Sequence, residues 1–384
     1  MKKNIMRIFV AVVSLAIVLP SCKKKEEGLK LTDETQVAVI EQFVNHTIAP
    51  TYTNLANNTD LLVEELKALR ADMTQTNLEK VCNTFLTARA WWEMSEAFLF
   101  GAASDFGIDP HIDSWPLDVD AFNTMMLNEN QIHAMDGEDG DVYAGEKLGN
   151  SLLGFHGIEY ILFANGSPKN IAQISDLDMI YAIAVAGDLR NRCFQLEVSW
   201  IGNAAAKAHR DKVEELELNT TVNGGNFSYG QNLKKAGTIG STYTSSVNGL
   251  MAIIDGCKTI ADEVGTSKIG KPYNGEDPDY IESPYSHKSI EDFYNNIISI
   301  ENAYYGGIEG QRNETYSLHN YIKTLNADVD AKVVAAINNA KSKIKAMPVP
   351  FVQNYQDPAN GVAAKACQNL DDVLSAVNRA LSEN

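Results

Sequence analysis

Apolar residues recur at intervals of three and four positions along nearly the whole chain, the spacing that gathers them on one face of an α-helix. Segments with this spacing cover residues 33–71, 77–100, 146–163, 176–218, 240–264, 289–305, 317–345 and 362–382. Outside a polar break at 219–230, no convincing run alternates apolar with polar residues as a half-buried strand does. The pattern therefore predicts an all-α protein.

The polar, glycine-rich break at 219–230 (NTTVNGGNFSYG) interrupts the helical pattern midway, with four segments before it and four after. The chain is also longer than a single hydrophobic core usually holds. We therefore expect two antiparallel helical bundles in tandem. The first bundle is predicted at 33–218, a linker at 219–239 and the second bundle at 240–384.

Two connections, at 101–145 and 265–288, are longer than a helical bundle needs. Both contain prolines, aspartates and aromatic residues, as in SWPLD at 114–118 and ESPYS at 282–286. Disordered segments are normally poor in aromatic residues. We therefore predict that both connections are ordered loops.

The N-terminus has the pattern of a secretion signal. Three basic residues at 2–7 precede an apolar run at 8–19, which is too short to span a bilayer as a permanent helix. The small residue before Cys22 fits the lipobox at which bacteria attach diacylglycerol to cysteine. We expect a signal peptide at 1–21, a lipidated Cys22 and a solvated tether at 22–32. An ordinary cleaved signal with an incidental cysteine is the alternative.

These features predict a lipoprotein of the cell envelope, held in the outer membrane by the lipid on Cys22 and facing the periplasm or the outside. The KKKEE run at 23–27 resembles a surface-export signal. The chain has a formal charge of −18, and removal of the predicted signal leaves −21. Such an acidic protein is repelled by phosphate backbones and attracts cations, so we expect no nucleic-acid partner.

Four cysteines remain after Cys22, at positions 82, 193, 257 and 367. They are widely separated and form no CxxC pair, so they do not suggest a zinc site. We expect them to be small buried apolar residues, and their pairing stays open.

The segment 151–164 (SLLGFHGIEYILFA) contains an unusual charged pair. His156 and Glu159 are three residues apart, which places them on one inward stripe of a helix. Gly154 and Gly157 lie on the other side, where they favour close packing of another helix. If other helices pack on both sides of this helix, Glu159 is buried, and a buried carboxylate must be paired or must bind a metal.

A second pair, Glu93 and Glu96, shares one face of an aromatic-rich helix. If this face meets His156 and Glu159 inside a bundle, the set resembles metal sites built from inward glutamates and histidines. Oxygen ligands with one imidazole suit iron, manganese or zinc. Asp118, in the 101–145 connection, would close the shell.

Each of these residues also has a purely structural interpretation. Glu93 could pair with Arg89 one helical turn earlier. His156 could be a core histidine bonded to Glu159, and Asp118 could be the N-cap of a helix that begins near residue 119. Ser289 with Asp292 predicts a capping box.

The residues GFHGIE at 154–159 form a GxHxxE motif that resembles the imelysin family, also called the M75 peptidase family. Residues 92–101, 115–118 and 283–306 also resemble segments of this family. The resemblance implies two related helical bundles with a site near their interface, in envelope proteins of iron uptake or its regulation. It also implies the following site residues. The implied metal ligands are His156, Glu159, Glu93, Glu96 and Asp118, and the possible interface residues are Trp115, Ser286 and Asp292.

The resulting hypothesis is an envelope lipoprotein that binds a divalent or ferric ion, iron or else zinc, and works with iron-uptake proteins. A metallopeptidase is the first alternative, although HExxH is absent and Tyr160 in place of a second histidine excludes HxxEH. A receptor for haem or for a protein, with a structural His156–Glu159 pair, is the second alternative.

Overall fold

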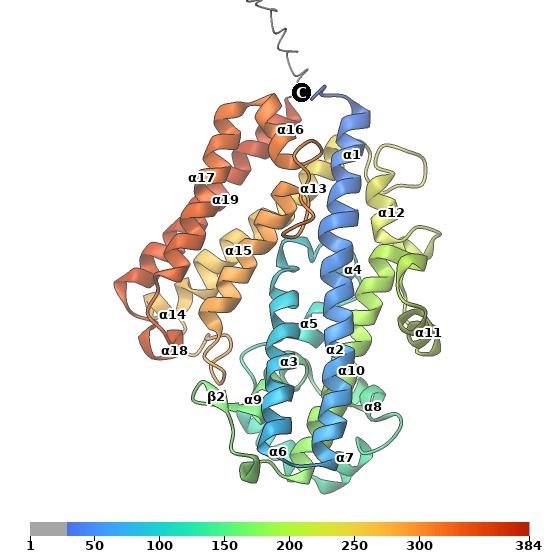
Figure 1. The fold of residues 1–384 in the computed structure, drawn as a ribbon, viewed down its shortest axis with the longest axis vertical. Coiled ribbons are helices and arrows are strands. Elements are labelled where there is room, and N and C mark those ends of the chain that lie inside the picture. Colours follow the sequence, from blue (N-terminus) through green and yellow to red (C-terminus); the bar gives the residue numbers. More distant parts are fainter. Residues whose placement is uncertain (1–28, 384) are drawn as a thin grey trace, which may run out of the picture.

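The computed structural model describes residues 29–383, so the predicted signal peptide, Cys22 and most of the tether lie outside the described residues. The described chain is almost wholly helical (Figure 1). Its only strands, β1 (Phe163–Ala164) and β2 (Ser167–Pro168), form one short antiparallel hairpin among these residues. The all-α prediction is confirmed. A search of residues 29–383 finds no helix with the length and hydropathy of a membrane span.

The first half is built on three long helices that lie side by side. These are α2 (Ala49–Ala71), α3 (Gln75–Glu93) and α10 (Asp176–Ile201), and both α3 and α10 pack along α2. Polar side chains fix where helices begin, because they satisfy backbone N–H groups that have no partner in the first turn. The Thr74 side chain accepts from the Asn77 N–H before α3, and Ser175 forms a capping box with Asp178 before α10.

The second half is a bundle of four longer helices. It contains α13 (Ser246–Glu263), α15 (Ser289–Tyr305), α17 (Ala327–Lys345) and α19 (Pro358–Ser382). Helix α19 packs against both α13 and α17, and α15 packs against α17 and α13. The shorter α16 (Leu318–Leu325) precedes α17 at one end of the bundle.

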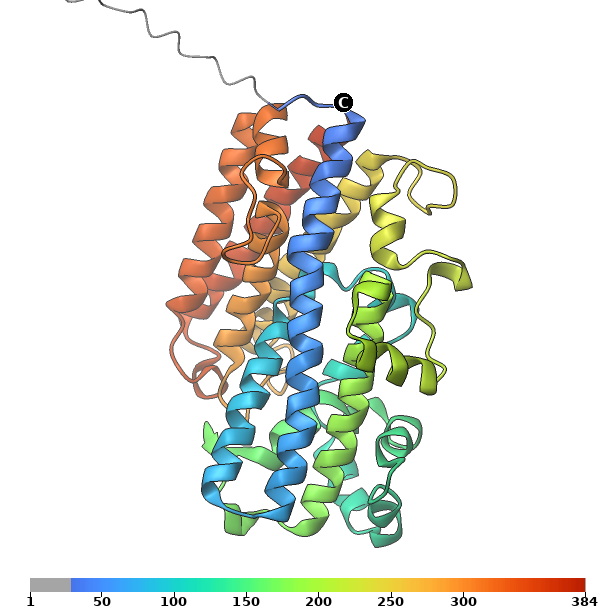
Figure 2. The same ribbon diagram turned by 45° about the vertical axis from the view of Figure 1, so that its right-hand side comes forward.

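One continuous helical run joins the two halves. Helix α1 (Asp33–Phe43) passes through a π-helical turn, η1 (Val44–Ile48), directly into α2, and both views show it along most of the molecule (Figures 1 and 2). Helix α1 packs on α13 of the second half, whereas α2 packs on α3 and α10. The halves therefore share one continuous hydrophobic core, which reaches from Val39 to Leu381.

The segment at 219–239, which was predicted to be a linker, packs against other helices of the protein. It contains α12 (Tyr229–Lys234), which contacts both α10 and α1. It is therefore part of the folded body of the protein rather than a free spacer.

The two long connections are folded, as expected. The first forms α4 (Ala102–Asp105), α5 (Asp109–Asp113), α6 (Val119–Met126), α7 (Glu129–Ala134) and α8 (Gly140–Lys147). The second begins with the π-turn η7 (Val264–Lys268) and continues into α14 (Gly270–Asn274). The remaining helices are α9 (Gly154–Leu162), α11 (Lys207–Glu215), α18 (Phe351–Asn354) and the 3₁₀ turns η2 (Glu96–Phe98), η3 (Asn150–Leu152), η4 (Ile171–Gln173), η5 (Gly202–Ala204) and η6 (Val222–Gly224).

The four cysteines of the described chain are buried and free, at positions 82, 193, 257 and 367. Their predicted role as small apolar core residues is confirmed, and burial raises the pKa of each thiol. They are therefore poor nucleophiles and poor metal ligands.

Candidate metal centre

Two glycines let the chain cover helix α9 closely. Gly154 begins the helix with φ +69°, and any side chain there would overlap the carbonyl of Ile112. A methyl group at Gly157 would overlap the hydroxyl of Tyr181, which donates a hydrogen bond to the carbonyl of Leu152 at 2.7 Å. The close packing predicted from these glycines is present. The covering groups are a tyrosine of α10 and a carbonyl of α5.

His156 and Glu159, the ionisable pair of the GxHxxE motif, are both buried. His156 is 4% exposed and Glu159 1% exposed. The Nε2 atom of His156 lies 2.9 Å from Oδ1 of Asp113, and its Nδ1 atom lies 3.7 Å from Oε2 of Glu159. The backbone N–H of Ser286 donates to Oε1 of Glu159 at 2.7 Å, while Oε2 has no hydrogen-bond partner among the described residues. A buried carboxylate oxygen is therefore left without a donor beside an imidazole.

Arg89 of α3 lies at the centre of the surrounding acidic residues and is 2% exposed. Its guanidinium pairs with Asp113, with Oε1 of Glu93 at 2.5 Å and with Oε1 of Glu282 at 2.6 Å. Asp292 of α15 is 4.0 Å away. The predicted Arg89–Glu93 pair is confirmed, and it is part of a larger cluster that joins both halves.

Lys268 supplies the second buried positive charge from the end of the π-turn η7. Its Nζ atom lies 3.2 Å from Oε1 of Glu282, 3.8 Å from Oε2 of Glu93 and 4.0 Å from Oε1 of Glu96. The amide of Asn296 also donates to Oε2 of Glu93 at 2.6 Å. The two cations therefore share the carboxylates of Glu93 and Glu282.

Carboxyl groups outnumber the permanent cations in this cluster. Five carboxylates lie within 4.0 Å of the two permanent cations, and they belong to Glu93, Glu96, Asp113, Glu282 and Asp292. Burial raises the pKa of Glu93 and Glu96 well above the usual range, and it raises the pKa of Asp292 to about 7. Such carboxylates favour a proton or an additional cation.

The pKa shifts of Asp113 and His156 favour the charged form of each side chain, in contrast to those of Glu93 and Glu96. Burial acts to raise the pKa of Asp113, but Arg89 and His156 outweigh it and hold this pKa well below its usual range. Burial acts to lower the pKa of His156, but its interactions with Asp113 and Glu159 raise it to about 9. The carboxylate of Asp113 is thus ionised under ordinary conditions and available as a ligand.

Two overlapping groups of side chains have the spacing of metal ligands. One group is Asp113, His156 and Glu282, and the other is Glu93, Glu96 and Asp113, with the ligand atoms of each group within 4.8 Å of one another. A carboxylate has enough lone pairs to keep its bond to Arg89 and still bind a metal. The excess of carboxyl groups over permanent cations also fits a bound cation.

The structure brings together four of the five predicted ligands, Glu93, Glu96, His156 and Glu159. Asp118 is not among them: it is exposed and caps α6, accepting from the N–H of Ala121 at 2.8 Å. Its alternative interpretation as an N-cap is confirmed. Asp113, at the end of α5 and directed at Arg89 and His156, takes the place expected for Asp118.

Three members of the cluster, Asp113, Lys268 and Glu282, were missed by the sequence analysis. Asp109 and Asp113 are four residues apart in DPHID, a spacing that shares one helix face and was an available signal. No comparable pattern marks Lys268 or Glu282, which come from the second long connection.

The three predicted interface residues lie around the cluster. The ring of Trp115 is 6.4 Å from that of His156, and Ser286 binds Glu159 as described. The predicted capping box of Ser289 with Asp292 is wrong. Asp292 instead accepts from the Ser283 hydroxyl at 2.5 Å, and the Ser289 hydroxyl bonds the carbonyl of Glu282. Both side chains are used to hold the 282–286 loop against the cluster.

A small cavity of about 180 Å³ opens onto His156 at the junction of the halves. Trp115, Pro116 and Leu117 line one part of it, and the rest is lined by Pro278, Asp279, Ile281, Pro284, Tyr285 and Val352. Trp115 packs on Tyr280 with ring centroids 3.8 Å apart, so residues from both halves cover the histidine.

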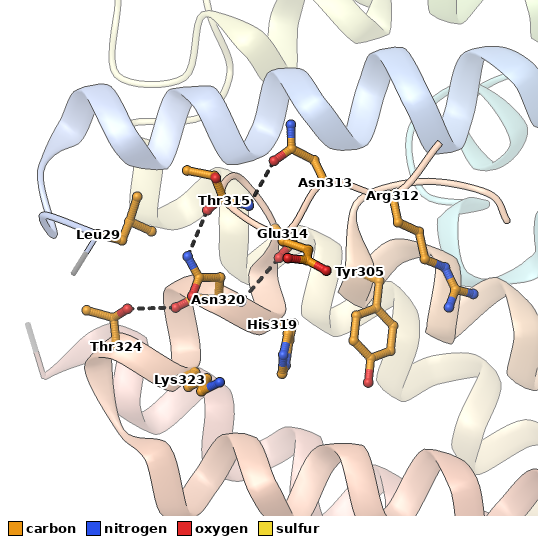
Figure 3. A pocket seen from close by; sticks show the side chains of 11 residues that line it. Leu29, Tyr305, Arg312, Asn313, Glu314, Thr315, His319, Asn320, Lys323 and Thr324 are labelled. Atoms are coloured by element: carbon orange, nitrogen blue, oxygen red, sulfur yellow. Dashed lines mark hydrogen bonds between the residues drawn. The ribbon is translucent and has the colours of Figure 1, made fainter. Parts of the chain in front are cut away.

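A larger cavity of about 890 Å³ lies elsewhere, between the end of α15 and α16 (Figure 3). Two of its charged side chains already have partners. Arg312 pairs with Glu301 at 3.3 Å, and Nδ1 of His319 contacts Asp330 at 2.7 Å. No residue of the Arg89 cluster lines this cavity.

An almost wholly helical chain with a buried GxHxxE pair close to Glu93, at the end of α3, and Glu96, in the turn η2, agrees with the expected imelysin-type protein. Residues 48–377 match the imelysin family, peptidase M75, and the chain belongs to this family. It is 26% identical over 339 residues to iron-regulated protein A of Synechococcus elongatus, across 88% of this chain and 83% of that protein.

Solved structures support the same relationship. A crystal structure from Parabacteroides distasonis, provisionally described as an iron-regulated protein A precursor, matches with a TM-score of 0.77 at 27% identity, over 92% of this chain and 97% of that one. An imelysin-like protein from Psychrobacter arcticum matches with a TM-score of 0.60 at 13% identity, over 92% and 95% of the two chains, and this likeness concerns the fold alone.

Proposed function

We propose that this protein is an envelope lipoprotein that binds a metal ion, iron or else zinc, in the Arg89 cluster and acts in iron uptake or its regulation. The observation that carries the proposal is the buried excess of carboxylates beside His156. The names of the relatives, which describe iron-regulated proteins, support the association with iron.

Each side chain of the cluster has a distinct role in this proposal. Asp113, His156 and Glu282 would hold the ion, and Glu93 and Glu96 add negative charge on the other side. Glu159, fixed by the N–H of Ser286, faces Nδ1 of His156 and would orient the ring so that Nε2 points towards Asp113 and the ion. Oxygen ligands with one imidazole suit iron, manganese and zinc.

The size of the cavity at His156 favours binding over proteolysis. Its volume of about 180 Å³ holds no more than about six water molecules, because each occupies about 30 Å³. A peptide substrate would need a groove open to His156. Trp115, which lines this cavity, packs on Tyr280 with ring centroids 3.8 Å apart and covers part of the approach to His156.

Metal binding is tested by thermal unfolding of the chelator-treated mature chain with Fe(II), Fe(III), Mn(II), Zn(II) or Co(II). A ligand at 100 times its dissociation constant stabilises a fold by about 2.7 kcal/mol, which is a measurable shift. We expect a shift in the wild type that is absent in His156→Gln and retained in Asp118→Asn, the matched control. No shift with any ion would make the cluster purely structural, and a haem or protein ligand would then be sought.

Membrane attachment through Cys22 needs a separate experiment, because this residue lies outside the described chain. Cells that express the wild type should incorporate radiolabelled palmitate into the protein and retain it in the outer membrane. The Cys22→Ser variant should lose both properties. Equal labelling of the two forms would contradict a lipid on Cys22.

A further inference from the structure

Glu96 is the member of the cluster that reaches the surface on the side away from His156. It is 9% exposed, and no hydrogen bond to its carboxylate is found among residues 29–383. Its ion-pair partner is Lys268, 4.0 Å away. This carboxylate is therefore largely buried and only weakly compensated.

Glu96 lines the inner end of a second pocket, of about 450 Å³, between the turn η2 and helix α13. Ser104, Tyr243, Asp255 and Thr259 supply the other polar groups of this pocket. None of its lining residues within the described chain is lysine, arginine or histidine. The pocket thus combines apolar residues with two carboxyl groups, those of Glu96 and Asp255, and has no basic group to oppose a cation.

The mouth of the cavity at His156 differs from this pocket in that a lysine lies beside it. Apart from His156 and Asp279, its wall consists mostly of proline, aromatic and aliphatic side chains. The ammonium of Lys271 lies 4.1 Å from the ring centroid of Tyr280, which packs on Trp115 at this mouth. A cation approaching from this side meets apolar rings and a fixed positive charge.

The two mouths are joined through Asp113. This residue belongs to the ligand group of Glu93 and Glu96 and also to the group of His156 and Glu282. A cation held at Glu96 would therefore reach the His156 group by exchanging carboxylate oxygens around one shared residue.

We propose that the pocket lined by Glu96 and Asp255 is the entry site through which a divalent cation loads the buried cluster. This inference rests on the proposed function, because it assumes that the cluster binds a metal. The pocket is large enough for a cation with six waters, which occupy about 180 Å³ at about 30 Å³ each. Its negative charge would raise the local concentration of cations, as charged clefts do for their ligands.

The test compares the rate of Co(II) association in variants of the two mouths. Co(II) quenches tryptophan fluorescence, and Trp92 reports on the cluster because its indole N–H donates to Asp113 at 2.8 Å. Asp255→Lys and Asp279→Lys change the charge equally, and each alters an exposed aspartate at one mouth. Stopped-flow quenching at low ionic strength measures both rates.

We expect Asp255→Lys to slow association about tenfold and Asp279→Lys to change it less than twofold. Asn378→Ala is the matched control, because Asn378 donates to Asp255 at 2.6 Å and its loss removes that bond but keeps the charge. It should associate at the wild-type rate. Equal rates in the two lysine variants, or slower association only in Asp279→Lys, would overturn the entry route. Absence of quenching in the wild type at equilibrium would overturn the proposed function and this inference with it.

Discussion

The Nε2 atom of His156 lies 2.9 Å from Oδ1 of Asp113, and this contact joins helix α9 to the short helix α5. Asp113 is also bound by Arg89 and by the indole N–H of Trp92. Asp113, which lies in the connection at 101–145, is thus a common partner of Arg89, His156 and Trp92. Among residues 29–383, no glutamate of the long helices has a hydrogen bond or ion pair with all three.

Replacing Asp113 by asparagine should weaken metal binding at least tenfold. The substitution keeps the shape of the side chain but removes a negative charge from both ligand groups. Isothermal titration with Co(II) measures the change. Asp118→Asn is the matched control, because Asp118 caps α6 and asparagine is as good an N-cap as aspartate. This variant should bind Co(II) as tightly as the wild type. Equal losses in the two variants would argue against a ligand role for Asp113.

Replacing Arg89 by methionine should destabilise the fold by about 3–5 kcal/mol, because it leaves several buried carboxylates without their cation. Arg70 provides the comparison. It also pairs with two aspartates, Asp136 and Asp176, but at the surface, so Arg70→Met should cost at most about 1 kcal/mol. Urea unfolding of both variants measures these free energies. Similar losses would mean that burial adds little to the role of Arg89.

Metal affinity should rise as the pH is raised from 7 towards 9. The pKa of His156 in the folded protein is about 9, and a protonated imidazole cannot bind a metal. Titrations with Co(II) between these pH values should approach one tenfold gain in affinity per pH unit, and His156→Gln should show a much flatter profile. A flat profile in the wild type would exclude Nε2 of His156 as a ligand.

The same group makes the metal-free fold less stable at high pH. The pKa of His156 is raised from 6.5 to about 9 on folding, so its stabilising contribution is complete below pH 6.5. It is lost as the pH rises through about 9. The urea midpoint of the wild type should therefore fall over this range more than that of His156→Gln. An identical fall in both proteins would contradict the assignment.

Alanine at Gly157 should destabilise the protein by about 1–3 kcal/mol, because the added methyl overlaps the Tyr181 hydroxyl. Tyr181→Phe removes that hydroxyl, together with its bond to Leu152. The double variant should therefore lose less stability than the sum of the two single losses. Thermal unfolding of the three variants completes the cycle, and strict additivity would show that the overlap is relieved elsewhere.

Much of the fold could be predicted from the spacing of apolar residues. The helix expected at 289–305 is α15 (Ser289–Tyr305) residue for residue, and the run expected at 33–71 is α1, η1 and α2 together. Helix α19 begins four residues before its predicted start. The reason is that Asp357 caps it through the N–H of Ala359, with Pro358 in the first turn.

The site could be predicted only where its residues lie on regular helices. Glu93, His156 and Glu159 face inward at α-helical spacing, so their direction could be read from the sequence. Lys268 is the last residue of a π-turn, which shifts the side-chain direction away from the 3.6-residue period. Asp113 ends a helix of five residues, too short to show any period.

The order in which the chain is synthesised matters for the cluster, because its members come from both halves of the chain. Arg89 and His156 precede the polar break, whereas Glu282 and Asp292 follow it. A chain that emerges N-terminus first cannot assemble the cluster until residue 292 is free to pack. No nascent fragment that ends before residue 282 contains the complete group of Asp113, His156 and Glu282. The compartment in which the finished chain folds therefore decides which metals it meets first.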